Sequence, residues 1–394
     1  MVRIKLAIKP RHEYIRMYNC YFGDCFRITT SNGNDLMVDF GIHDKQGVKK
    51  GDRKKRFNEI YLDNKDNRID FLLSHYHADH YNGIMYMKGL SYTFNDVYIP
   101  DIWSFNCSIN LIVLSLLEEI LNKGFIGDRE NRENLYFFLS SICKSNICFV
   151  QRGTTIQNKY IALWPSQEYI NEKANIIMKE IKKDSHISEE YLSFLFDRAR
   201  ELKEIVSAMS EPGDKERLMS RLEYSEMQVA EWSQHLQLEG LESNIAYDLS
   251  GFKNDISIVF QNIKSNNDNI LFTGDFGEAA GLWDLIETNR VPGSSIPMHA
   301  NYHIIKVGHH GTKSFYHSFV GRINQESILL IPNGASKDSW GICSNYSLNA
   351  LTTGAKILCS TDRTCEARKN NNGNCTCSNF KIIEKTSSFY YDVN

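Results

Sequence analysis

Residues 72–83 read LLSHYHADHYNG and contain three histidines and one aspartate within six positions. The mostly apolar run from Ile69 to Leu73 has the composition of a buried strand, and Ser74 begins a loop. Neutral imidazole and carboxylate are the ligands that zinc and similar divalent ions prefer. A loop at the carboxyl end of a strand can turn four such ligands onto two adjacent ions. The spacing therefore predicts a metal site, and a polar turn with coincidental histidines is the less favoured interpretation.

Three further motifs follow the same pattern, because each places polar side chains directly after an apolar run. They read NDLMVDFG at residues 34–41, NILFTGD at residues 269–275 and HIIKVGHHGT at residues 303–312. Together with HxHxDH, and in this order along the chain, they resemble the motifs of the metallo-β-lactamase superfamily. The joint agreement of four motifs is far more specific than any one of them.

A narrower resemblance connects the chain to the lactamase-like domain of ComEC-type DNA-uptake proteins. It is carried by YNCYFGDCFRI at residues 18–28, by NDISIVF at residues 254–260 and by KVGHHGT at residues 306–312. These matches lie in residues 15–100 and 245–335, a little under half of the chain. The middle of the chain and its tail have no counterpart in the resemblance.

The resemblance implies an α/β fold, the αββα sandwich of that superfamily, formed by residues 1–394 around one interruption. From residue 166 to about residue 240 the sequence is highly charged, and its apolar residues recur at helical spacing. This stretch predicts a helical insertion. A cap over the active site, an arm for self-association and a surface for a protein partner all fit it, and the sequence does not separate these roles.

By the same resemblance, His75 and His77 hold a first divalent ion, Asp79 and His80 hold a second, and Asp275 bridges the two. Zn²⁺ and Mn²⁺ are both candidates, as one ion or as two. The complete set of implied metal ligands is His75, His77, Asp79, His80, Asp275 and His309.

The choice between the adjacent histidines His309 and His310 follows from their distance to Thr312. The H-x-G-T form of the family motif favours His309 as the ligand, whereas its His-Gly form favours His310, and we take His309. His310 is then a proton donor, or a ring that only orients its neighbour. Asp79 is expected to orient the attacking water and to accept its proton, so that Asp79 and His310 are the candidate catalytic residues.

One departure from the family concerns the third histidine that often completes the first site. Residues 248–255 read DLSGFKND and contain no histidine, and His235 lies in a helical pattern too far away. The first site is then completed by water, by Asn254 or by Asp255. An oxygen-rich site of this kind shifts the preference from Zn²⁺ toward Mn²⁺.

These features predict a metal-dependent hydrolase that cleaves phosphodiesters in a nucleic acid or nucleotide, as a nuclease-like enzyme or as an effector in a multi-protein system. Two ions suit phosphodiester cleavage because both the attacking and the leaving oxygen need stabilisation. A hydrolase of small esters, lactams or cyclic nucleotides remains an alternative, since fold does not determine substrate. A metal-binding module that recruits a partner is another.

Bulk properties narrow the class of protein. The formal net charge is −3, with 42% hydrophobic and 24% charged residues, which is an ordinary globular balance. The opening MVRIKLAIKPRHEY lacks the apolar core of a signal peptide, which predicts a cytoplasmic protein. The most apolar run, INLIVLSLL at residues 109–117, is too short to span a bilayer. The basic stretch Lys45–Arg56 is expected to be a loop, either a solvated surface or an attractor of anionic substrate.

The tail at residues 355–380 forms a second candidate metal site. Four of the ten cysteines lie there, in a polar stretch with little apolar sequence to order it. A structural Zn²⁺ would supply that order, whereas free thiols in a loop are the alternative. Disulfides are disfavoured in a cytoplasm. The candidate ligands are Cys359, Cys365, Cys375 and Cys377.

Overall fold

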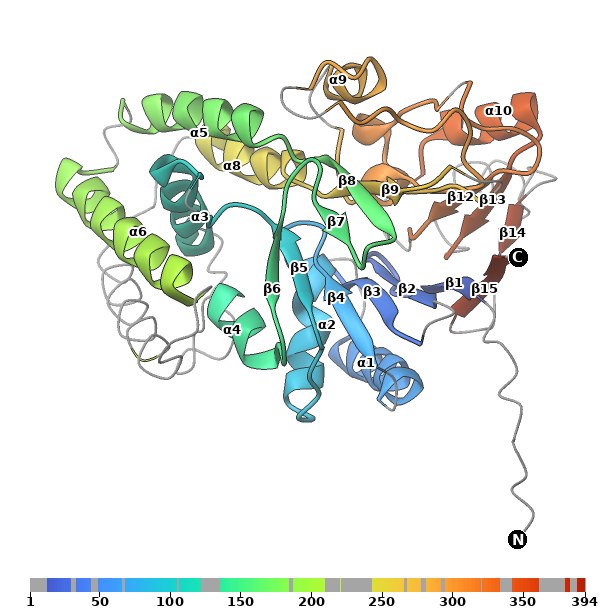
Figure 1. Cartoon of the computed structure of the whole chain (residues 1–394), viewed down its shortest axis with the longest axis horizontal. Coiled ribbons are helices and arrows are strands. Elements are labelled where there is room, and N and C mark those ends of the chain that lie inside the picture. Colours follow the sequence, from blue (N-terminus) through green and yellow to red (C-terminus); the bar gives the residue numbers. More distant parts are fainter. Residues whose placement is uncertain are drawn as a thin grey trace, which may run out of the picture.

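The described strands form two mixed sheets, one of seven strands and one of eight (Figure 1). Helices flank both sheets, which confirms the predicted α/β class. The computed structural model describes residues 13–29, 33–43, 49–65, 68–104, 106–121, 135–183, 187–209, 220, 243–265, 268–277, 281–291, 295–319, 321–333, 342–360, 380–382 and 388–393.

The first sheet is antiparallel at one edge and parallel at the other. Strands β15, β1, β2 and β3 pair in antiparallel fashion, whereas β3, β4, β5 and β6 run parallel. Strands β2 to β5 are buried on both faces, which explains their nearly continuous apolar sequences. In spatial order the strands are β15 (Ser388–Val393), β1 (Glu13–Tyr18), β2 (Cys25–Thr29), β3 (Asp35–Phe40), β4 (Ile69–Leu72), β5 (Val97–Pro100) and β6 (Ile147–Val150).

The second sheet has a parallel block and an antiparallel edge. Strands β10 to β14 run parallel, and β9, β8 and β7 continue the sheet in antiparallel fashion. In spatial order the strands are β14 (Phe380–Ile382), β13 (Lys356–Cys359), β12 (Ile328–Ile331), β11 (Ile304–Lys306), β10 (Ile270–Phe272), β9 (Val259–Asn262), β8 (Tyr160–Trp164) and β7 (Thr155–Ile156).

A shared hydrophobic core holds the two sheets face to face. Fully buried Phe26 of β2 meets Phe272 of β10 edge to face, with ring centroids 5.3 Å apart. Phe272 also stacks on Phe260 of β9 at 5.2 Å. Burial of each such ring contributes about 1.5–3 kcal/mol, so this aromatic contact helps to fix how the two sheets face each other.

Two further apolar clusters lie on the outer faces of the sheets. The cluster on the first sheet includes side chains of α1, α2, α3, α4, α5, α6 and α8, and the cluster on the second sheet includes those of α9 and α10 (Figure 1). The described helices are α1 (Lys50–Asn64), α2 (Ala78–Lys88), α3 (Ile109–Leu121), α4 (Leu135–Ile142), α5 (Gln167–Ile181), α6 (Glu189–Met209), α8 (Ser243–Asp255), α9 (Leu282–Glu287) and α10 (Ser344–Thr353), with short 3₁₀ turns η1 (Gly308–Gly311) and η2 (Lys313–Phe315).

The expectation of a loop at Lys45–Arg56 is wrong for most of that stretch. Helix α1 begins at Lys50, and residues 44–48 lie outside the described residues. The charge run is helical because Phe57 and Ile60, which follow it at helical spacing, are buried against the first sheet. The basic side chains occupy the exposed first turns of that helix.

The predicted helical insertion at about 166–240 is described only in part. Helices α5 and α6 lie within it and pack against α3, in the same core as the first sheet. Residues 210–219 and 221–240 lie outside the described residues. The segment leaves β8 and, through α8, returns in β9, its antiparallel neighbour in the second sheet.

The cysteine-rich tail is likewise described in part. Cys359 is buried at the end of β13, whereas Cys365, Cys375 and Cys377 lie outside the described residues. The predicted zinc site there stays a prediction. In the part of the chain that the structure describes, no helix combines the length and apolarity needed to cross a membrane.

Candidate metal centre

The polar side chains predicted to bind metal follow the carboxyl ends of β4, β10 and β11, and the end of β3 adds Asp39. Parallel strands of one sheet end at the same edge, so β3 and β4 bring their loops together, as do β10 and β11. Because the two sheets face each other, the two pairs of loops meet. The centre therefore draws on segments from residue 24 to residue 310.

The turn that carries Asp24 is held against the first residues of α2. The backbone N–H of Asp24 donates to the carbonyl of Asp79 at 3.3 Å, and that of Gly41 donates to the carbonyl of Asp24 at 3.0 Å. A Cβ atom on Gly41 would lie 2.3 Å from the carbonyl carbon of Asp79, so only glycine permits this approach. The close contact places the carboxylate of Asp24, fully buried, inside the centre.

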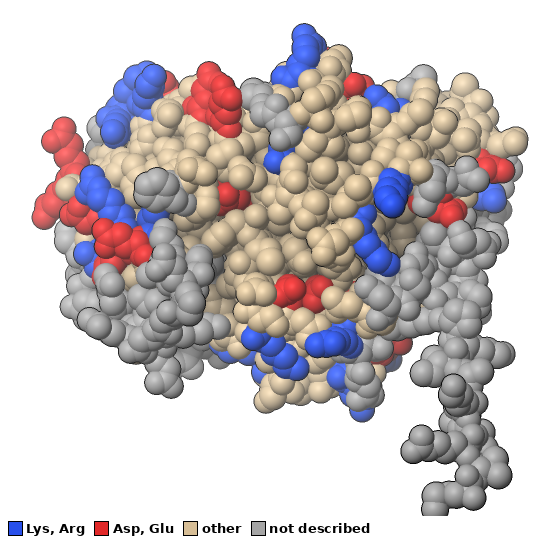
Figure 2. Space-filling view, viewed as in Figure 1, with Lys and Arg blue, Asp and Glu red and all other residues tan. Residues whose placement is uncertain are grey.

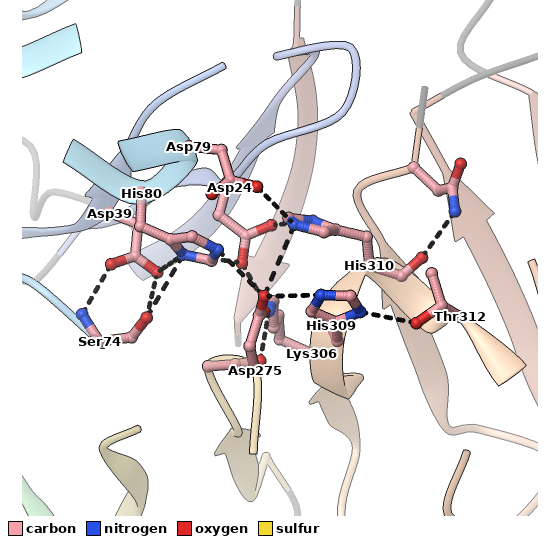
Figure 3. Close-up of polar contacts among 12 residues, drawn as sticks. Asp24, Asp39, Ser74, Asp79, His80, Asp275, Lys306, His309, His310 and Thr312 are labelled. Atoms are coloured by element: carbon pink, nitrogen blue, oxygen red, sulfur yellow. Dashed lines mark hydrogen bonds and ion pairs between the residues drawn. The ribbon is translucent and has the colours of Figure 1, made fainter. Parts of the chain in front are cut away.

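Asp275, in the loop after β10, is the hub of the centre (Figure 3). Its Oδ2 atom lies 3.3 Å from Nε2 of His80 and 3.7 Å from Nε2 of His310. The Nε2 atoms of His75 and His309 both lie 3.8 Å from the same oxygen. Four imidazole nitrogens thus surround one carboxylate oxygen, and none of them makes a close hydrogen bond to it. This arrangement is expected of ligands around a cation site.

A carboxylate behind His80 fixes the orientation of that ring. Nδ1 of His80 lies 2.9 Å from Oδ2 of Asp39, and the same carboxylate accepts bonds from the backbone N–H and the hydroxyl of Ser74, each at 2.7 Å. Nε2 of His80 is therefore left to face Asp275. A carboxylate that orients a ligand histidine in this way sets its tautomer and raises its basicity as a ligand.

The two adjacent histidines of η1 have different environments. His310 is fully buried, with Nδ1 3.0 Å from Oδ1 of Asp24 and Nε2 3.4 Å from Oδ2 of Asp79. The side chain of His309 is 22% exposed, and its Nδ1 lies 2.7 Å from the hydroxyl of Thr312. Both residues have positive φ angles, which are uncommon for residues other than glycine.

A buried lysine completes the charge pattern. Lys306, the last residue of β11, places Nζ 2.5 Å from Oδ2 of Asp24, 2.6 Å from the carbonyl of Gly274 and 3.4 Å from Oδ1 of Asp275. Burial by itself lowers the pKa of Lys306, but Asp24 and Asp275 outweigh burial and hold that pKa above its ordinary value. The ammonium group is therefore charged inside the protein.

The pKa shifts divide the histidines into two sets. Burial lowers the pKa of His75 well below its ordinary value, that of His77 to about 3 and that of His309 to about 4. Burial also disfavours the charged forms of His80 and His310, but Asp275 and other carboxylates raise the pKa of His80 well above its ordinary value and that of His310 to about 9. The carboxylates thus favour the protonated forms of His80 and His310, and a divalent cation would compete with those protons.

The donor set fits a divalent ion. Among the described residues, four groups of three donors have ligand atoms within 4.8 Å of one another. The Nε2 atoms of His80 and His310 are fully buried and make no hydrogen bond of good geometry, which is unusual for buried polar atoms. The groups are His75, His80 and Asp275; Asp79, His80 and His310; Asp24, Asp275 and His310; and Asp24, Asp39 and His80.

These groups contain four of the six predicted ligands. His77 and His309 belong to none of the four groups: Nδ1 of His77 lies 3.0 Å from Nε2 of His75, and His309 lies at the exposed rim. Asp255, a candidate for completing the first site, pairs instead with Lys173 of α5.

Three residues of the centre were not predicted as site residues, namely Asp24, Asp39 and Lys306. Each lies within a motif that carried the family resemblance, so their positions in those motifs were the available signal.

Comparisons of the chain with protein-family models and with curated proteins give no match.

Proposed function

We propose that this chain is a metal-dependent hydrolase of the metallo-β-lactamase type and that it cleaves phosphodiesters. One observation carries the proposal: four imidazole nitrogens lie 3.3–3.8 Å from a single buried carboxylate oxygen, Oδ2 of Asp275. The layering of helices on the outer faces of two stacked sheets also supports the αββα arrangement of that superfamily.

His75, His80, Asp79, Asp275 and His310 would hold the ion or ions. When bound, divalent ions lower the pKa of a water molecule toward neutrality and polarise the oxygen under attack. The protein supplies the positions: Asp39 orients His80, and the Asp24 turn holds the start of α2 in place. Both effects restrict the ligands before substrate arrives, which is how a preorganised site lowers a reaction barrier.

The two histidines of η1 differ in exposure and therefore suit different roles. His310 is fully buried between Asp24 and Asp79, and it suits a ligand. His309 is 22% exposed, its ring is held by Thr312 and Phe315, and burial lowers its pKa to about 4, so this neutral ring suits contact with the substrate or an ion rather than proton donation. The side chain of Asp79 is 13% exposed, so this carboxylate can meet both the ion and the attacking water.

The basic first turns of α1 favour a phosphodiester over a neutral ester or lactam. Lys50, Lys54 and Lys55 are exposed there, and Arg56 stacks on Tyr21 in the turn that leads to Asp24. Blue side chains gather at the lower edge of the face in Figure 2, where α1 and α2 lie. Positive charge on this helix would attract a polyanion and bind phosphates beyond the scissile one.

The test combines metal analysis with three substrates. Purified protein is analysed for Zn²⁺ and Mn²⁺ and incubated with linear DNA, RNA and bis-p-nitrophenyl phosphate in either ion. His80→Ala and Asp79→Ala are expected to lower cleavage at least about 100-fold, since each removes a ligand. His317→Ala, which changes a histidine bonded to Glu287 outside the centre, serves as the matched control. Metal-loaded protein that cleaves none of the three substrates would contradict the proposal.

A further inference from the structure

Lys306 lies between two buried carboxylates, where a bound cation would otherwise be needed to neutralise their charge. Its side chain is buried, and its ammonium group reaches Oδ2 of Asp24 and Oδ1 of Asp275. The other oxygens of the same two carboxylates face the histidines, because Oδ1 of Asp24 lies 3.0 Å from His310 and Oδ2 of Asp275 lies 3.3 Å from His80. Lys306 thus uses one oxygen of each carboxylate and leaves one oxygen of each for a metal.

The same two carboxylates also form one of the donor groups able to hold an ion, together with His310. A divalent ion in that group and the ammonium group of Lys306 would draw on the same negative charge. The group formed by His75, His80 and Asp275 shares only Asp275 with Lys306. The positive charge of Lys306 should therefore weaken the binding of an ion beside Asp24 more than the binding of an ion beside His75.

Formal charges of the centre lead to the same conclusion. Four carboxylates contribute four negative charges, from Asp24, Asp39, Asp79 and Asp275, and Lys306 contributes one positive charge. With Lys306 present, one divalent ion leaves a net charge of about −1 and two ions about +1. Without Lys306, two ions leave about zero, so the second ion would meet no net repulsion.

We infer that Lys306 sets the metal count of this centre: it stands in for part of a second ion, so that the protein holds one divalent ion tightly and a second ion weakly. The inference rests on the proposed function only in requiring that the centre binds metal. Even at the dielectric constant of bulk water, a unit charge and a divalent ion about 4 Å apart repel enough to change a dissociation constant about thirtyfold.

The test is a Zn²⁺ titration of metal-free protein against a chromophoric chelator, with bound zinc counted by elemental analysis. Wild type is expected to bind one ion tightly, and Lys306→Met is expected to bind the second ion at least about thirtyfold more tightly than wild type does. Lys306→Arg keeps the charge and should retain the weak second site. Lys253→Met is the matched control. Lys253 donates to the carbonyl of Tyr76 and lowers the pKa of His77, but it does not lie between the two carboxylates.

Removal of the lysine leaves two buried carboxylates without their cation, so Lys306→Met is also expected to gain more thermal stability from added Zn²⁺ than wild type. If Lys306→Met does not fold, Lys306→Ala, which leaves space for water, is titrated in its place. Equal second-site affinity in wild type and the neutral variant, or two tight ions already in wild type, overturns the inference while the metal centre stands. Failure of every variant and of wild type to bind Zn²⁺ overturns the proposed function as well.

Discussion

Asp39→Asn tests whether a carboxylate outside the proposed ligand set controls metal binding through His80. The backbone N–H of Ser74 donates to Oδ1 of Asp39, so the oxygen of the new amide must occupy that position. The amide NH₂ group then replaces Oδ2 and points at Nδ1 of His80, which is 2.9 Å away. Nδ1 must accept that bond, and the ring proton moves to Nε2, the atom that faces Asp275. The variant thus keeps the shape of the centre but places a proton on Nε2 of His80, which can then no longer bind a metal.

The expected loss follows from this change of tautomer. Replacement of a carboxylate that orients a ligand histidine typically costs about 10–100-fold in metal affinity. The loss of a charge-assisted hydrogen bond in a buried position should also lower the free energy of unfolding by about 1–3 kcal/mol. The assay is the chelator competition titration with Zn²⁺, and urea unfolding of the same samples measures stability.

Asp70→Asn separates the effect on the ligand from a general loss of stability. Asp70 is as buried as Asp39 and accepts three bonds, from Asn34, Gln157 and the backbone of Asp96, but it lies within β4 and outside the four donor groups. The Asp70→Asn variant should therefore be less stable than wild type and bind metal with the same affinity. A zinc affinity of Asp39→Asn within about threefold of wild type would refute the reasoning about the His80 tautomer.

Asp275→Asn should weaken zinc binding by more than about 100-fold, because the hub oxygen faces four imidazoles; the same titration checks this, and retained affinity would remove Asp275 from the ligand set. Gly41→Ala should lower the free energy of unfolding by about 1–3 kcal/mol or more in urea, since its Cβ would overlap the Asp79 backbone. Gly51→Ala in exposed α1, where a Cβ meets nothing within 4 Å, is its control and should be neutral or stabilising. Replacing Lys50 and Lys54 with alanine should flatten the salt dependence of DNA cleavage and leave bis-p-nitrophenyl phosphate cleavage unchanged; equal losses on both substrates would separate α1 from substrate binding.

Local features of the centre followed from the sequence, because they depend on neighbouring residues. The apolar run before Ser74 predicted a strand followed by a loop, and β4 ends at Leu72. The HxHxDH spacing predicted donors on that loop, and His75, Asp79 and His80 each belong to a donor group, although Asp79 and His80 lie in the first turn of α2 rather than in a loop. The prediction of a loop at the start of α1 was wrong because the charge run alone carries no helical pattern. The burial of Phe57 and Ile60, which follow it, makes the stretch helical.

Tertiary structure alone decided which distant residues meet. Asp24 and Lys306 are 282 positions apart in the sequence, and their ion pair exists because β2 and β11 lie in facing sheets whose loops share one edge. His309 and His310 both have positive φ angles, but the ring of His310 is fully buried and that of His309 is 22% exposed, a difference that no spacing rule contains. The sequence by itself thus determined which donors are present and where each strand ends. Strand order and sheet packing determined which donors lie close enough to share an ion, because only they bring the loops of the two sheets together.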